Sequence, residues 1–170
     1  MFRKIAILGA GNVAHHFVEA LHHTNLEVIQ IYSRSDASAK SLAEKYAIPY
    51  SAELNQLSSE ADLYLFFLSD TGINELAETF PHKNKVMLHS SGSIPMDIFV
   101  IKTTQYGVVY PYQTFRKEIP MDFEKVPLCL EASDVELMQK LVGLAENLNC
   151  KSYQIDSRQR QILHLAAVFA

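Results

Sequence analysis

The sequence predicts an α/β fold of the Rossmann-like, doubly wound type with a mainly parallel sheet, and three observations support it. Short apolar segments alternate with amphipathic helical segments along most of the 170 residues. Residues 62–68 are apolar enough to be buried on both faces, as strands of a parallel sheet are. The turn Gly9-Ala10-Gly11 joins the first predicted strand to the first predicted helix. Ligands in such folds bind beyond the carboxyl ends of the strands, where the strand order reverses.

The first half of the chain contains four predicted strands with helical segments between them. We expect strands at 4–8, 27–32, 48–50 and 62–68, helices at 12–23, 36–46 and 69–80, and a helical turn at 52–57. Ser35 is suited to cap the second helix, and Asn25 to stop the first. The first helix has one apolar stripe, and its polar residues are expected on the opposite, solvated face: His15, His16, Glu19, His22 and His23. We expect no metal site from these histidines at this spacing.

The second half continues the alternation and ends in an apolar helix. We expect strands at 86–89, 107–110, 126–131 and 151–155, a short helix near Pro95, and a helix at 134–148 that Ser133 caps. A last helix begins near Ser157 and grows more apolar up to Ala170. Leaving such a stripe in water costs about 25 cal/mol per Å². We therefore expect residues 1–156 to form a nucleotide-binding domain and residues 157–170 to begin a further helical domain or to pack against a partner.

The composition argues against several classes of protein. Fifteen Lys and Arg stand against nineteen Asp and Glu, so no basic excess is present to neutralise a nucleic acid. The longest apolar runs have six residues, whereas a membrane span needs about 20. The apolar run at residues 5–8 is too short for the core of a signal peptide. Cys129 and Cys150 have no metal-binding spacing and are expected to be reduced.

The turn after the first strand matches the dinucleotide fingerprint Gly-x-Gly-x-x-Ala. Gly9 permits a tight turn, Gly11 lacks the Cβ atom that would meet a pyrophosphate, and Ala14 allows close packing of helix and strand. The free N–H groups of the helix start, at Asn12 and Val13, would face the phosphates. The motif has the flanking strand and helix that it requires, so it predicts a bound nucleotide.

The end of the second strand indicates which dinucleotide is bound. An NAD enzyme usually carries Asp or Glu there, but this chain has Ser33, Arg34 and Ser35. Arg34 can pair with a 2′-phosphate and stack on adenine, and the two hydroxyls can donate to the phosphate. We therefore expect NADP as the cofactor. The alternative is an arginine in a solvated loop beside a helix-capping serine.

Polar residues follow the next two strands, where a nicotinamide would lie. Ser69, Asp70 and Thr71 suit either cofactor contacts or a helix cap. His89 is a candidate proton donor, or else a buried histidine that fixes its loop. Ser90 and Ser91 are candidates for polar contacts to the nicotinamide or the substrate. Three further residues are expected to border the same crevice: Tyr110, Gln113 and Thr114.

Five segments of the chain resemble a bacterial family of NADP oxidoreductases, in which a Rossmann-like domain precedes a helical domain of unknown function. They are residues 7–14, 32–35, 89–93, 110–115 and 163–167, and the similarity spans essentially the whole chain. The first two segments are common to many reductases, and the last three are more specific. The chain is similar, more distantly, to pyrroline-5-carboxylate reductase, the deazaflavin-dependent NADP oxidoreductases and the 6-phosphogluconate-dehydrogenase-like group. The resemblance implies a cytoplasmic protein that binds NADP and dimerises through the helical domain.

The resemblance also draws attention to His164 on the last predicted helix. It lies near the position where the 6-phosphogluconate-dehydrogenase-like group carries a catalytic lysine. This chain has no lysine there, so the lysine mechanism is not carried over, and His164 is a candidate acid instead. The sequence thus favours an NADP-dependent oxidoreductase that passes a hydride between the nicotinamide and a small carbonyl, imine or hydroxy compound. Two alternatives stay open: a non-enzymatic nucleotide-binding or sensing module, and a Rossmann fold for another adenine nucleotide.

Overall fold

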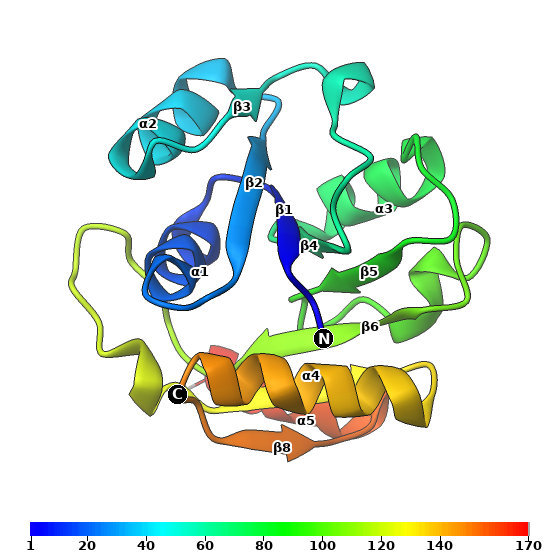
Figure 1. Ribbon diagram of the computed structural model, residues 1–170. Helices are drawn as coiled ribbons and strands as arrows, with labels where there is room; N and C mark the ends of the chain where they lie inside the picture. Colours follow the sequence, from blue (N-terminus) through cyan, green and yellow to red (C-terminus); the bar gives the residue numbers. More distant parts are fainter. Residues whose placement is uncertain (170) are drawn as a thin grey trace.

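A computed structural model describes residues 1–169 of the chain, which form one eight-stranded sheet with helices on both faces (Figure 1). The strand order is β3-β2-β1-β4-β5-β6-β7-β8. The strands span Lys4–Leu8 (β1), Glu27–Tyr32 (β2), Tyr50–Ser51 (β3), Leu63–Phe66 (β4), Val86–His89 (β5), Tyr106–Pro111 (β6), Leu128–Ala132 (β7) and Ser152–Gln154 (β8). The doubly wound, mainly parallel fold expected from the sequence is therefore confirmed.

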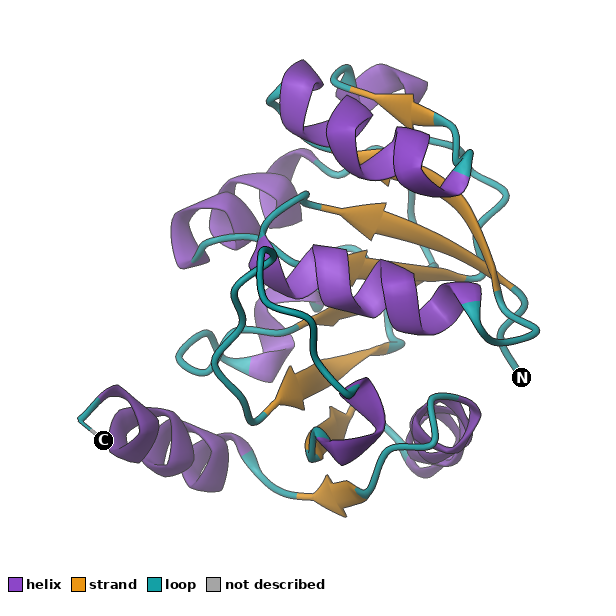
Figure 2. Ribbon diagram, turned by 90° about the vertical axis from the view of Figure 1, so that its left-hand side faces the viewer, coloured by secondary structure: helices purple, strands orange, loops and turns teal. Residues whose placement is uncertain are grey.

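The order of the strands reverses at β1, which pairs in parallel with β2 on one side and with β4 on the other. The carboxyl ends of β1, β2, β4, β5 and β6 consequently lie along one edge of the sheet. Most strand arrows point to that edge in Figure 2. Only the β6–β7 pairing is antiparallel, so β7 and β8 run in the opposite direction to the rest. The loops that follow the first six strands are the candidates for a ligand site.

The helices lie where the sequence pattern places them. They span Asn12–His22 (α1), Asp36–Tyr46 (α2), Asp70–Thr79 (α3), Val135–Asn147 (α4) and Ser157–Val168 (α5), with short 3-10 turns at Leu54–Gln56 (η1), Met96–Phe99 (η2) and Phe123–Lys125 (η3). Ser35 caps α2 by accepting a hydrogen bond from the Ser38 N–H, as predicted. The helix expected to reach Ala170 is observed to Val168, and Ala170 lies outside the described residues.

Three local expectations were wrong. Asp134, not Ser133, caps α4, because its carboxylate accepts from the Leu137 N–H at 2.8 Å. Ser133 instead donates to the Thr104 carbonyl, next to the start of β6. Asn25 does not stop α1, which ends at His22 with His23 as its C-cap. His16 is not on a solvated face: it is buried, and its Nε2 lies 3.0 Å from the carbonyl oxygen of Arg116.

Two hydrophobic clusters cover the two faces of the sheet. One joins β1, β2 and β4 to residues of α1, α2 and α4, including Phe17, Leu42 and Leu141. The other packs α3 and η2, through Ile73, Leu76 and Phe99, against the opposite face. Among residues 1–169, no helix combines the length and the apolar character that crossing a bilayer requires. The core thus packs helices against both faces of the sheet and leaves the loops at the carboxyl edge to form a site.

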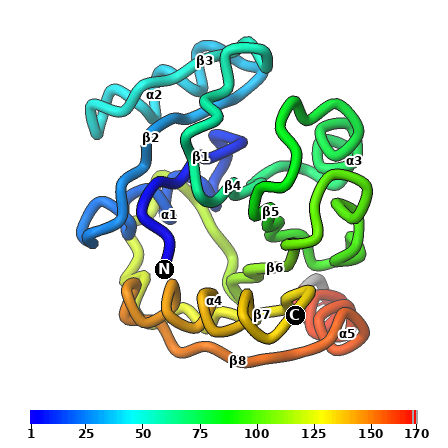
Figure 3. The backbone as a smooth tube through the Cα atoms, turned by 45° about the vertical axis from the view of Figure 1, so that its right-hand side comes forward, coloured from blue at the N-terminus to red at the C-terminus, as the bar shows by residue number. Residues whose placement is uncertain are grey.

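The last helix, α5, lies beside β6 and β7 at the end of the sheet (Figure 3). Asp156 and Gln159 form a reciprocal capping box at its start. Leu163 packs on a small cluster with Val108 and Cys129. Two other apolar side chains, Ile162 and Leu165, are each 59% exposed. The helix is therefore docked on the sheet along one side and apolar on its free side.

Candidate dinucleotide-binding site

Gly9 makes the tight turn between β1 and α1. Its φ angle is +118°, a value that side-chain-bearing residues rarely adopt. A Cβ atom at this position would overlap the carbonyl oxygen of Phe67, which follows β4. The Gly9 N–H donates to the carbonyl of Tyr32, at the end of β2, at 2.7 Å. This turn therefore brings the ends of β1, β2 and β4 into contact.

Gly11 has open space where its Cβ atom would be, with no atom within 4 Å. It is the N-cap of α1 and supplies no side chain to the free N–H groups of the first turn, which begins with Asn12 and Val13. No acidic residue lies in that turn. The N-terminus of α1 thus combines free donors, a partial positive charge and room for an anion. A cleft of about 360 Å³ adjoins this turn and is lined by residues that include Gly9, Gly11, Ser33, Arg34, Ser35 and Ser69.

The residues after β2 present hydroxyl and guanidinium donors to the same cleft. The Ser33 hydroxyl oxygen accepts from the Ser35 N–H, and the Ser35 oxygen accepts from the N–H and hydroxyl of Ser38. Both serines are used as acceptors in these bonds, so their own O–H protons remain available to an anion. Arg34 is 66% exposed and pairs with Glu75 of α3 at 2.6 Å. The set has the chemistry of a phosphate site.

An apolar slot of about 240 Å³ adjoins the cleft. Its walls come from β2, η1 and α3, and they include Tyr32, Leu54, Leu68 and Leu76. Arg34 and Leu68 line both the slot and the cleft. A ligand with an aromatic ring joined to phosphates can therefore lie in both at once, with Arg34 at the junction.

Ser69 and Asp70 connect the end of β4 to the loop after β5. Ser69 caps α3 by accepting from the Gly72 N–H at 3.3 Å, so its capping role is confirmed, and it also lines the cleft. Asp70 accepts from the hydroxyl of Ser91 at 2.7 Å and from the hydroxyl of Ser93 at 2.9 Å. Ser90 lies half-buried at the start of that loop. Asp70 thus joins the start of α3 to the loop after β5.

Ser91 and His89 fix the conformation of the loop after β5. Ser91 is buried, and its hydroxyl oxygen also accepts from the N–H groups of Ser93 and Ile94. His89 is fully buried: Nδ1 accepts from the Ser91 N–H, and Nε2 lies 3.2 Å from the Pro95 carbonyl. Burial, reinforced by the charge of Arg160, lowers the pKa of His89 to about 4. His89 is therefore neutral at physiological pH, with both nitrogens committed to its own loop.

His164 reaches the same edge of the sheet from α5. Its Nδ1 lies 3.1 Å from the Tyr110 hydroxyl, at the end of β6. Its ring lies against Gly92, where a Cβ atom would overlap the imidazole. His164 is half-buried, whereas Tyr110 is buried, and burial raises the pKa of the Tyr110 phenol. The structure therefore brings His164 beside the loop of Ser90, Ser91 and Gly92.

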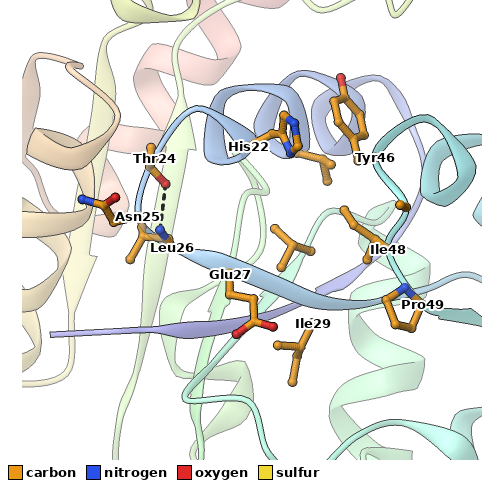
Figure 4. A pocket seen from close by; sticks show the side chains of 12 residues that line it. His22, Thr24, Asn25, Leu26, Glu27, Ile29, Tyr46, Ile48 and Pro49 are labelled. Atoms are coloured by element: carbon orange, nitrogen blue, oxygen red, sulfur yellow. Dashed lines mark hydrogen bonds between the residues drawn. The ribbon is translucent and has the colours of Figure 1, made fainter.

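A cavity larger than this cleft lies at the other edge of the sheet. It measures about 490 Å³ and adjoins the start of β2 and the end of α2, with Thr24, Glu27, Tyr46 and Pro49 among its lining residues (Figure 4). None of the predicted site residues lines it. Parallel strands present their amino ends there, away from the helix N-termini that attract phosphate. Cavity size therefore does not locate the site in this protein.

The chain matches a family described as NADP oxidoreductase, coenzyme F420-dependent, over residues 4–89. This segment contains β1 to β5 and, with them, the whole glycine turn and the cleft. The protein belongs to this family. Residues 126–170 match a second family, a domain of unknown function termed DUF2520.

Solved structures agree with this family assignment. A crystal structure described as "putative NADP oxidoreductase BF3122 from Bacteroides fragilis" is 38% identical, with a TM-score of 0.92 over 98% of this chain and 66% of that one. Protein TM1727 from Thermotoga maritima is 25% identical, with a TM-score of 0.76 over 97% and 62%. A pyrroline-5-carboxylate reductase from Streptococcus pyogenes shares the fold at 18% identity, with a TM-score of 0.72 over 91% and 59%. Among curated proteins, none matches the chain.

The chain thus spans less than two-thirds of the length of each of these structures. Most of its predicted site residues divide into three groups; outside these groups, Asn12 and Val13 begin the first turn of α1 and do not line the cleft. Those lining the cleft are Gly9, Gly11, Ser33, Arg34, Ser35 and Ser69. Asp70, His89, Ser90, Ser91, Tyr110 and His164 gather around the loop after β5. Gln113 and Thr114 lie exposed in the loop after β6, where the Gln113 amide oxygen accepts from the Thr114 N–H.

Sequence reasoning missed Arg160, which holds this second group in place. It is fully buried, pairs with Glu131 of β7 and donates to the carbonyls of Ser91 and Ile94 at 2.7 and 2.9 Å. The one signal in the sequence was Glu131 itself, a carboxylate that ends the predicted apolar strand 126–131. A charge buried in a strand needs a partner, and Arg160 supplies it.

Proposed function

We propose that the protein is an NADP-dependent oxidoreductase that transfers a hydride between the nicotinamide and a small carbonyl, imine or hydroxy compound. One observation carries the proposal: Arg34 lines both the cleft and the apolar slot, Ser33 and Ser35 line the cleft beside it, and no carboxylate from β2 lines either space. The family description, NADP oxidoreductase, supports the same cofactor.

The cofactor would be held by groups that fit its parts. The N–H groups at Asn12 and Val13 would face the pyrophosphate across the open side of Gly11. Arg34 would pair with the 2′-phosphate, with the Ser33 and Ser35 hydroxyls donating to it. Adenine would occupy the apolar slot. Ser69, Asp70 and Ser90 would border the ribose and carboxamide of the nicotinamide half.

NADPH supplies the hydride when it is bound; the protein must orient the substrate and provide a proton. We assign the proton donor as His164, the half-buried imidazole beside the loop after β5. As an imidazolium, His164 would donate from Nδ1 to the Tyr110 oxygen and carry a second proton on Nε2; passing that second proton to a substrate would leave the neutral imidazole. Ser91 and His89, whose polar atoms serve their own loop, would support catalysis by shaping it.

This acid role has a direct test once a substrate is found. We expect His164→Ala to lower turnover by roughly 10²- to 10⁴-fold, the usual contribution of a general acid, with NADPH affinity nearly unchanged. Tyr110→Phe, which removes only the hydroxyl next to Nδ1, should move the pH dependence of turnover. Full turnover in His164→Ala would exclude His164 as the acid.

We also propose an oligomeric state, domain boundaries and a cellular location for the protein. The exposed Ile162 and Leu165 of α5 support packing of this helix against further helical structure in a homodimer. Residues 1–156 would then be the NADP-binding domain and residues 157–170 the start of the helical one. The buried, free thiols of Cys129 and Cys150 suit a reducing, cytoplasmic location.

A non-enzymatic nucleotide-binding or sensing role is the second candidate. One observation favours it: α5 carries His164, and not a lysine, near the position of the catalytic lysine in the 6-phosphogluconate-dehydrogenase-like group. Substrate-dependent oxidation of NADPH separates the two roles. A screen of small ketones, imines and 2-hydroxy acids should yield at least one compound that accelerates the loss of NADPH absorbance. A protein that binds NADPH tightly and turns over none of them would match the sensing role.

A further inference from the structure

The ion pair between Arg34 and Glu75 spans the slot that the proposed function assigns to adenine. Arg34 enters from the end of β2, and Glu75 enters from the middle of α3. Their side chains meet at 2.6 Å, although they are 66% and 54% exposed. The rest of the slot is lined mainly by apolar side chains such as Leu54, Leu68 and Leu76. Glu75 is therefore the anionic group that lies next to Arg34 in this slot.

A dinucleotide that extends from Gly11 into the slot would lie against Arg34, because Arg34 lines both spaces. A 2′-phosphate at this point would meet a guanidinium already bonded to a carboxylate. It would also carry its own charge to within a few ångströms of that carboxylate, and like charges at such a distance repel. The phosphate and Glu75 consequently compete for Arg34.

We propose that Glu75 is a specificity-determining residue that weakens NADPH binding by competing for Arg34. This inference rests on the proposed function. NADH, with a neutral 2′-hydroxyl, does not enter this competition, and a carboxylate can accept a hydrogen bond from that hydroxyl. Arg34, Ser33 and Ser35 favour NADPH over NADH. Glu75 therefore lowers the ratio of NADPH affinity to NADH affinity that these three residues create.

The test compares Glu75→Gln with the wild-type chain by calorimetric titration of NADPH and NADH at low ionic strength, where an exposed pair is least screened. Glu78→Gln is the matched control: it removes the same charge from an exposed position one helical turn after Glu75, and Glu78 does not line the slot. Glu75→Gln should tighten NADPH about 2- to 5-fold, the range of an exposed ion pair. The affinity for NADH should stay the same or fall, and Glu78→Gln should change neither.

A double-variant cycle checks that the effect runs through Arg34. In an Arg34→Ala background, Glu75→Gln should give a smaller gain in NADPH affinity than in the wild type. Equal NADPH affinity in Glu75→Gln and Glu78→Gln would overturn the inference while leaving the proposed function intact, and so would an equal tightening of NADH. A folded wild-type chain that binds neither nucleotide would overturn the proposed function and this inference with it.

Discussion

Arg160 donates a hydrogen bond to the carbonyl oxygen of Ser91 at 2.7 Å, across 69 residues of sequence. The same guanidinium holds the Ile94 carbonyl and pairs with Glu131. The loop after β5 and the helix that carries His164 are thus attached to one buried cation. Because both parts depend on Arg160, the candidate catalytic residue and the candidate nicotinamide loop keep a fixed relation to each other.

Arg160→Met should therefore be strongly destabilising. It leaves the Glu131 carboxylate buried without its partner, which costs about 3–5 kcal/mol in comparable cases. Urea unfolding followed by circular dichroism measures the loss, with Arg158→Met as the control, since Arg158 is exposed on the same helix. The double variant Arg160→Met/Glu131→Gln should recover part of the stability, because no unpaired charge remains. A loss below about 1 kcal/mol in Arg160→Met would mean that the pair does not fix α5.

Gly9 and Gly11 should respond differently to the same substitution. Gly9→Ala forces a Cβ atom onto the Phe67 carbonyl and a side chain onto a φ angle of +118°, so the free energy of unfolding should fall by several kcal/mol. Gly11→Ala meets open space and should change stability by less than about 1 kcal/mol. Its methyl group would, however, occupy the room proposed for the pyrophosphate. Thermal unfolding and NADPH titration of both variants separate the two roles; normal NADPH binding by Gly11→Ala would contradict the proposed phosphate position.

His89 should make stability depend on pH. Its pKa is lowered from 6.5 to about 4 in the folded protein, so the unfolded chain binds more protons between these values. The neutral His89 imidazole therefore makes its full contribution to the free energy of unfolding above about pH 6.5, and this contribution is lost as the pH falls towards 4. A shift of this size corresponds to roughly 3 kcal/mol. The free energy of unfolding of the wild type should fall more steeply over this range than that of His89→Gln; parallel curves would show that His89 does not titrate in this way.

The bounds of several elements were predicted almost without error from local pattern. β1, β2, α2 and β5 begin and end at the expected residues, since each has a continuous apolar run or an amphipathic stripe with a clear cap. The glycine turn was equally readable, because backbone conformation and close approach restrict residue type at Gly9. The loop pairings that shape the site, such as Asp70 with Ser91 and Ser93, lie more than 20 residues apart. Spacing along the chain carries no information about such contacts.

At other positions, contacts between segments distant in sequence determined the structure, and the local sequence pattern did not predict it. His16 resembles the other histidines of its helix in sequence, yet the loop after β6 covers it and supplies the Arg116 carbonyl as its partner. The reversed direction of β7 likewise depends on how residues 112–127 return to the sheet, which local periodicity does not specify. The ion pair of Arg34 with Glu75 joins two segments 41 residues apart and is visible only in three dimensions.

The most direct test of the account is the ratio of NADPH to NADH affinity in the wild-type chain and in Arg34→Ala, measured by calorimetry in a phosphate-free buffer. The wild type should bind NADPH more tightly than NADH. Arg34→Ala should weaken NADPH by about 10- to 150-fold, the range of a charge-assisted contact, and leave NADH nearly unchanged. Equal weakening of both nucleotides, or a wild-type chain that binds them equally well, would contradict the central claim that Arg34 recognises a 2′-phosphate.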